Sequence, residues 1–88
     1  MLSTQAAAVC RSIAANLRRA RLGRGWTQEQ LGEKAGVAPR YVQRIETGGV
    51  NPSAVVVAAL AAALSLDPGR LFRPARMSER RLGRPPKR

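Results

Sequence analysis

The chain has no histidine and a single cysteine, Cys10, among its 88 residues. These absences exclude a zinc site built from cysteine and histidine, and they exclude a histidine-dependent nucleophile. One cysteine cannot form an intramolecular disulfide, so a reducing compartment fits best. No constellation of acids, bases or metal ligands stands out. We therefore expect a binding protein and not an enzyme, without a cofactor or a metal.

Long apolar runs are also missing. The longest, over residues 54–66, has thirteen residues including one serine, whereas a membrane-spanning helix needs about 20. The N-terminus has no cationic stretch followed by an apolar run, so we expect no signal peptide. The sequence therefore predicts no membrane-spanning helix and a cytoplasmic protein.

Acidic side chains are scarce, because 5 acids stand against 16 basic residues and leave a formal charge of +11. Such an excess predicts a polyanionic partner, either DNA, RNA or an acidic membrane surface. Much of the charge lies in residues 73–88, which hold seven basic side chains, one acid and three prolines. This basic tail has few apolar side chains, so we expect it to be disordered when free.

Helical periodicity and turn residues predict one small all-α domain over residues 9–72, preceded by an N-terminal arm over 1–8. A first helix is expected over about 7–22. A T-x-x-Q capping box at 27–30 begins the second helix, and Gly36 ends it because the turn needs a positive φ.

Three further helices are expected after this turn. Pro39 suits the first turn of a helix that ends near Thr47. The sequences Asn-Pro-Ser at 51–53 and Asp-Pro at 67–68 begin two more, which end near residues 64 and 72. The expected core is formed by the inward-facing positions Cys10, Ile13, Leu17, Leu31, Ala35, Val37, Val42, Ile45, Leu60, Leu64, Leu66, Leu71 and Phe72.

Residues 28–46, QEQLGEKAGVAPRYVQRIE, are the most informative segment. They predict two short helices joined by a tight turn. A helix-turn-helix has this arrangement and presents its second helix to the major groove of DNA. We interpret the small Ala35 as the place where the two helices cross closely.

Several ordered motifs extend this pattern: T-Q-x-x-L at 27–31, A-G-V at 35–37, Y-V-x-x-I-E at 41–46 and N-P-S at 51–53. Together with an arginine at position 21 and LAAALSLDPGRLF behind them, they resemble the lambda repressor/Cro-like (XRE-type) helix-turn-helix family. The resemblance covers about residues 9–72 and implies a compact five-helix bundle. It also implies a transcriptional regulator of the repressor or controller type that binds double-stranded DNA beside the bacterial nucleoid.

The helix expected from residue 39 is the candidate reader of bases. A guanidinium can donate two hydrogen bonds to O6 and N7 of guanine, so Arg40 and Arg44 are candidate base contacts, although either could bind a phosphate instead. Gln43 could read adenine or bind a phosphate, and Pro39 could pack against a thymine methyl group. Ala38 leaves this helix without a side-chain cap.

Phosphate contacts are expected around the reader. The resemblance implies that the Gln28 amide contacts a phosphate and braces a side chain of the recognition helix. Thr27 is mainly a cap, although its backbone could face a phosphate. The Tyr41 ring could cover the core edge, and its hydroxyl could reach a phosphate. The resemblance also places Asn51 and Ser53 along the DNA backbone, with a simple helix cap as the alternative for Asn51.

The resemblance further implies a partly buried, structural ion pair between Arg21 and Glu46. The other arginines near the end of the first helix, Arg18, Arg19 and Arg24, are expected to steer phosphates or to aid solubility.

A homodimer is expected, because the loop at 47–53 and the turn at 67–70 form the dimer contact in many relatives. Val55 and Val56 either extend that contact or are tolerated on a half-buried face. A dimer would place two recognition helices about 34 Å apart and require a near-palindromic operator.

The end of the basic tail resembles an AT-hook, because it contains Gly-Arg-Pro at 83–85 between basic residues. The narrow minor groove of A·T-rich DNA attracts arginine. Generic phosphate binding and an idle, solubilising tail are the alternatives. The candidate tail contacts are Arg81, Arg84, Lys87 and Arg88.

Two other functions fit the same fold. An antitoxin would repress its own operon and use the tail to bind its toxin. A docking module would bind a protein partner through the fold, or RNA through the tail.

Overall fold

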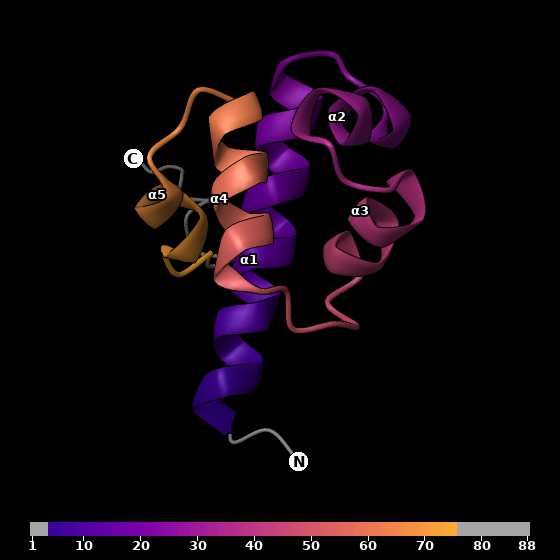
Figure 1. The fold of residues 1–88 in the computed structure, drawn as a ribbon. Helices are drawn as coiled ribbons and strands as arrows, with labels where there is room; N and C mark the ends of the chain where they lie inside the picture. Colours follow the sequence, from indigo (N-terminus) through magenta and orange to yellow (C-terminus); the bar gives the residue numbers. More distant parts are fainter. Residues whose placement is uncertain (1–3, 76–88) are drawn as a thin grey trace, which may run out of the picture.

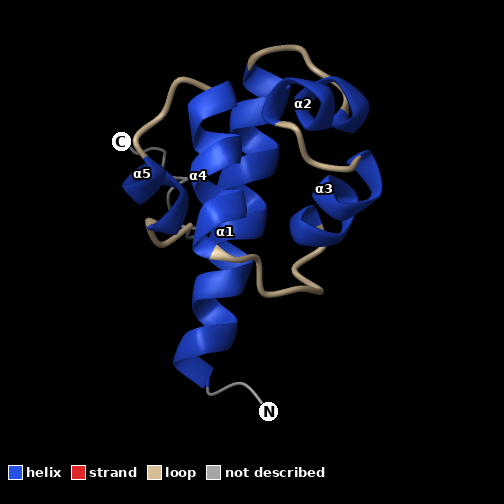
Figure 2. Cartoon of the chain, viewed as in Figure 1, coloured by secondary structure: helices blue, strands red, loops and turns tan. Residues whose placement is uncertain are grey.

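The computed structural model describes residues 4–75, so residues 76–88 of the basic tail lie outside the described part. Described residues form helices and loops without a strand (Figure 2). The predicted all-α class and five-helix architecture are confirmed. The helices are α1 (Thr4–Gly23), α2 (Gln28–Ala35), α3 (Pro39–Glu46), α4 (Ala54–Ala63) and α5 (Pro68–Phe72).

The helices are arranged so that α1 and α4 lie between α5 and the α2–α3 pair (Figure 1). α1 contacts α3 and α5, whereas α4 contacts α2 and α5. α1 and α4 thus both join the α5 side of the domain to the α2–α3 side. No helix within residues 4–75 has the length and apolar composition that crossing a membrane requires.

α1 begins at Thr4, three residues before the expected start at residue 7. The buried side chains of α1 begin only at Cys10, whereas residues 5–8 are Gln-Ala-Ala-Ala, whose three alanines favour a helix by intrinsic propensity alone. Residues 4–8 of the expected arm therefore belong to α1.

Side-chain caps fix the starts of the later helices. The Thr27 hydroxyl accepts a hydrogen bond from the Gln30 amide at 3.0 Å, and the Gln30 side chain accepts one from the Thr27 amide at 2.8 Å. This is the expected capping box. Ser53 caps α4 and Asp67 caps α5. Asn51 is therefore not the cap of α4, and the alternative role expected for it is wrong.

The core agrees with the expected positions except at its edges. Cys10 is buried, as are the inward-facing residues from all five helices. Phe72 is instead 46% exposed, because its neighbour Leu71 occupies the inward position of the short helix α5. Leu66, Ala35 and Val37 are only partly buried and pack against the edge of the core.

A close approach between α2 and the chain leading into α3 occurs at Gly32, which the sequence analysis did not identify. A Cβ atom on Gly32 would lie 2.5 Å from the Val37 carbonyl oxygen and 3.3 Å from the Pro39 Cα. Only glycine fits there without moving the backbone. The predicted positive φ at Gly36 is confirmed, with a value of 73°.

The chain after α5 is attached to α1. The Asn16 amide donates to the carbonyl oxygens of Leu71 at 3.0 Å and Arg73 at 2.7 Å. The Ser12 hydroxyl accepts a hydrogen bond from the Ala75 amide at 3.4 Å. The two Asn16 bonds satisfy carbonyl groups that would otherwise lack a donor at the end of α5. Together with the Ser12 bond, they place the beginning of the basic tail beside α1.

Candidate nucleic-acid interface

α3 is an eight-residue helix with one buried side and one exposed side. Its buried residues are Val42 and Ile45, at 0% and 1% exposure. The spacing of three residues places both on the core face of one helix. The four residues predicted to contact bases are all exposed: Pro39, Arg40, Gln43 and Arg44.

The exposed side chains of α3 are not committed to other protein groups. Within residues 4–75, no hydrogen bond or ion pair engages the side chains of Arg40, Gln43 or Arg44. Their donors are therefore available to an external acceptor such as a base edge or a phosphate.

A hollow of about 470 Å³ lies between the first turns of α2 and α3. It brings two predicted phosphate contacts, Thr27 and Gln28, together with predicted base contacts of α3. Glu29 also lines this hollow, a feature that the sequence analysis did not identify. Its carboxylate repels a phosphate and therefore lowers the positive potential of this hollow. The hollow is lined by Thr27, Gln28, Glu29, Pro39, Arg40 and Gln43.

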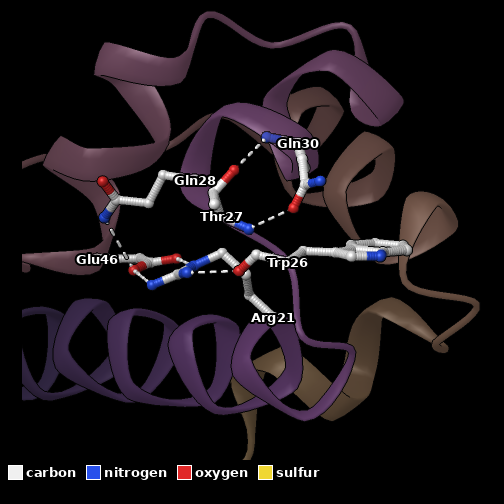
Figure 3. A network of polar contacts seen from close by, with 6 residues as sticks. All are labelled: Arg21, Trp26, Thr27, Gln28, Gln30 and Glu46. Atoms are coloured by element: carbon white, nitrogen blue, oxygen red, sulfur yellow. Dashed lines mark hydrogen bonds and ion pairs between the residues drawn. The ribbon is translucent and has the colours of Figure 1, made fainter.

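A buried polar network holds α3 in place (Figure 3). Arg21 of α1 donates to both carboxylate oxygens of Glu46, from Nε at 2.7 Å and from Nη2 at 2.9 Å. Its Nη1 donates to the Trp26 carbonyl oxygen at 2.8 Å. The two side chains of the pair are only 10% and 3% exposed. The ion pair implied by the family resemblance is thus present and ties the end of α3 to α1.

The electrostatics of this network favour the charged arginine. The hydrogen bond to Glu46 raises the pKa of Arg21 above its ordinary value, and the Coulomb attraction of the same carboxylate adds to this effect. Burial acts in the opposite direction because it penalises the charge. Arg21 is therefore a structural cation and is not available to DNA.

Gln28 joins the start of α2 to the same network. Its Nε2 donates to Glu46 Oε1 at 3.1 Å (Figure 3). The amide thus braces the last residue of α3, and it retains a second N–H for an external acceptor. This geometry fits both parts of the role that the resemblance implies.

The remaining predicted contacts surround α3. Tyr41 is partly buried and packs against the core, so its ring covers the core edge. Asn51 and Ser53 are exposed in the loop after α3, and the Ser53 hydroxyl also accepts the bond that caps α4. Ala38 provides no side-chain cap for α3, as expected.

The comparison with family models decides the family. A model described as helix-turn-helix matches residues 17–71, more than half of the chain. The chain belongs to the XRE-type helix-turn-helix family. The match covers α2 and α3, the end of α1 and nearly all of α5, so it includes every element that positions the exposed side of α3.

Two solved structures are similar to this XRE-type chain. The hypothetical transcription factor NHTF from Neisseria is 30% identical with a TM-score of 0.74, and the match covers 82% of this chain and 80% of that one. The restriction-modification controller protein C.AhdI from Aeromonas hydrophila is 35% identical with a TM-score of 0.69, covering 72% and 96%. A comparison with curated proteins finds no match. Family and neighbours support a DNA-binding regulator and not an enzyme.

Arg24 makes two contacts within the protein that the sequence analysis did not predict. Its Nη2 donates to the Leu64 carbonyl oxygen at the end of α4, at 2.7 Å. Its guanidinium also lies over the Trp26 ring, 5.3 Å from the centroid, and the Lys34 ammonium lies 4.9 Å from the same centroid. Arg24 and Trp26 therefore join the α1–α2 loop to α4.

The predicted tail contacts, Arg81, Arg84, Lys87 and Arg88, lie outside the described residues.

Proposed function

We propose that this XRE-type chain is a sequence-specific transcriptional regulator of the repressor or controller type, which reads the major groove with α3. The observation that carries the proposal is the exposed side of α3, whose polar side chains have no partner within residues 4–75. The buried side of the same helix is fixed on α1 by the Arg21–Glu46 pair. A reader needs both properties, because base recognition depends on donors that are free and well positioned.

The roles of individual residues follow from this orientation. We assign Arg40 and Arg44 to guanine, Gln43 to adenine or a phosphate, and Pro39 to a thymine methyl group. Each correct bidentate contact discriminates against a wrong base by about 1–3 kcal/mol.

Phosphate contacts would anchor both ends of the reader. Gln28, beside the first turn of α3, would bind one strand through its second amide N–H. The Thr27 amide already donates to the Gln30 side chain, so only the Thr27 hydroxyl proton remains for a phosphate. The loop residues Asn51 and Ser53 would bind the backbone near the other end, and the Tyr41 hydroxyl would add a contact from the first turn of α3. These contacts fix orientation and carry no sequence information themselves.

Dimerisation is supported by apolar side chains that the described residues leave uncovered. Val55 of α4 is 79% exposed, and Phe72 of α5 is 46% exposed. Val56, in contrast, is partly buried against the core. We propose that Val55 and Phe72 extend the homodimer contact of the loop at 47–53 and the turn at 67–70. The dimer would bind a near-palindromic operator in the cytoplasm.

Selection from a random duplex DNA library by the full-length protein tests this function at near-physiological salt. An enriched inverted repeat, with half-site centres about one helical turn apart, is the expected result. Enrichment of A·T-rich tracts alone, or of nothing, would refute the regulator and favour an architectural binder or a docking module. A parallel selection with the Arg40→Ala, Arg44→Ala variant is the control, because it should lose the repeat while remaining folded.

A further inference from the structure

α5 lies across α1 and α4 from α3 (Figure 1). A second basic surface lies on this α5 side of the domain. It is a cleft of about 500 Å³ between α1, the end of α4 and α5. Four arginines line it, and we call it the arginine cleft: Arg19, Arg24, Arg70 and Arg73.

The charge of the arginine cleft is uncompensated. None of its lining residues is acidic. Within residues 4–75 the structure records one ion pair, which is Arg21–Glu46, so none of the four arginines has a carboxylate partner there. The nearest acid in sequence to Arg70 is Asp67, which accepts the Gly69 amide as the cap of α5. Cations gathered without a counter-charge repel one another, and a bound anion would relieve this repulsion.

The cleft is also held in shape by contacts that a merely solvated basic surface does not need. Arg24 is fixed between the Leu64 carbonyl oxygen and the Trp26 ring. The backbone of Arg73 is held by the Asn16 amide, which itself lines the cleft. Among the four guanidinium groups, that of Arg24 is the one held by recorded contacts, so this group loses less conformational entropy when it binds a ligand.

We propose that the arginine cleft binds a small anion with two or more linked phosphate groups, of the pyrophosphate or nucleoside diphosphate class. Guanidinium groups match phosphate oxygens with two parallel hydrogen bonds. Small-molecule sites usually enclose about 300–1,000 Å³, and the cleft lies within this range. Linked phosphates can engage several of the four arginines at once, whereas a single orthophosphate can satisfy fewer. This site is separate from α3 and does not depend on the proposed reading of DNA.

Calorimetric titration of the full-length protein with inorganic pyrophosphate tests the proposal at about 0.15 M salt, where diffuse charge effects are largely screened. The cleft variant is Arg19→Gln, Arg73→Gln. The control is Arg11→Gln, Arg18→Gln, which removes the same charge from exposed positions of α1 outside the cleft. Circular dichroism establishes that both variants are folded.

Saturable binding of one pyrophosphate per chain is expected for the unmodified protein and the control. The cleft variant should bind at least about tenfold more weakly, because it loses charge-assisted hydrogen bonds. Orthophosphate should bind more weakly than pyrophosphate. The emission of Trp26, the only tryptophan, should change during the titration because Arg24 lies over its ring.

Three outcomes would overturn the proposal. Equal weakening in both variants would mean that the overall positive field, and not the cleft, attracts the anion. Absence of saturable binding would mean that the cleft is not a phosphate site. Unchanged pyrophosphate binding, together with weaker binding of duplex DNA in the cleft variant than in the control, would assign the cleft to the DNA backbone.

Discussion

The substitution Glu46→Leu tests the most consequential interaction of the described residues. It removes both carboxylate acceptors of Arg21 and the acceptor of Gln28, while it retains a side chain of similar size. Arg21 then remains buried with the Trp26 carbonyl oxygen as its recorded partner. Removing one member of a buried ion pair costs about 3–5 kcal/mol, and small domains are stable by only about 5–15 kcal/mol. The variant should therefore be close to unfolding.

Urea denaturation at pH 7, followed by circular dichroism, measures this loss. The pKa of Arg21 is raised by folding, so its contribution is fully present below the unfolded pKa and disappears only as the pH rises through the folded pKa. Measurement at pH 7 therefore captures the whole effect. The control is Glu33→Leu, an exposed residue of α2 without a recorded ion pair, which should change stability by less than about 0.5 kcal/mol.

The double variant Arg21→Met, Glu46→Leu tests whether the loss of stability in Glu46→Leu comes from leaving the buried Arg21 charge without its carboxylate. Apolar replacement of both members of a buried pair is often neutral or stabilising. The double variant should consequently be more stable than Glu46→Leu alone. If Glu46→Leu costs less than about 1 kcal/mol, or if the double variant is the less stable of the two, the reasoning from a buried, mutually dependent pair is refuted.

Three other perturbations have separate readouts. Arg40→Ala should relax base preference at one operator position by about 1–3 kcal/mol without unfolding; Arg18→Ala is the charge-matched control, and an unchanged preferred site would remove Arg40 from the reader. Gly32→Ala should lower stability by about 1–3 kcal/mol in urea denaturation, because its Cβ would meet the Val37 carbonyl oxygen; the gain of about 1 kcal/mol expected from helix propensity alone would contradict this contact. Deleting residues 76–88 should weaken DNA binding across all sequences and reduce the salt slope by about 0.9 for each phosphate that the tail neutralises; an unchanged slope would refute tail binding.

The sequence predicted the parts of the fold that depend on local chemistry. The capping box at Thr27, the turn at Gly36 and the start of α3 at Pro39 involve residues a few positions apart, and their propensities agree with the bundle. The apolar spacing of Val42 and Ile45 likewise identified the buried side of α3, and therefore its exposed side.

Contacts between distant segments were not predictable from such patterns. Asn16 binds carbonyl oxygens 55 and 57 residues away, and Arg24 binds one that is 40 residues away. Neither residue is marked by periodicity or by a turn motif. Gly32 was missed for a related reason. The backbone segment that lies against Gly32 comes from the turn before α3, and the residues next to a glycine within a helix do not indicate such a contact. The Arg21–Glu46 pair was found only through the family resemblance.

The arginines of this chain cannot be told apart by residue type, but they have different functions because their partners differ. Arg21 and Arg24 are bound by a carboxylate and by a carbonyl oxygen, so they position α3 and the α1–α2 loop. Arg40 and Arg44 are exposed on α3, and the buried side of this helix is held on the core. Loss of DNA binding in an Arg21 variant would therefore report a displaced α3, whereas the same loss in a folded Arg40 variant would report a lost contact. The net charge of +11 attracts a polyanion, but this division among partners is what leaves one side of α3 with the free donors that the proposed reading of bases requires.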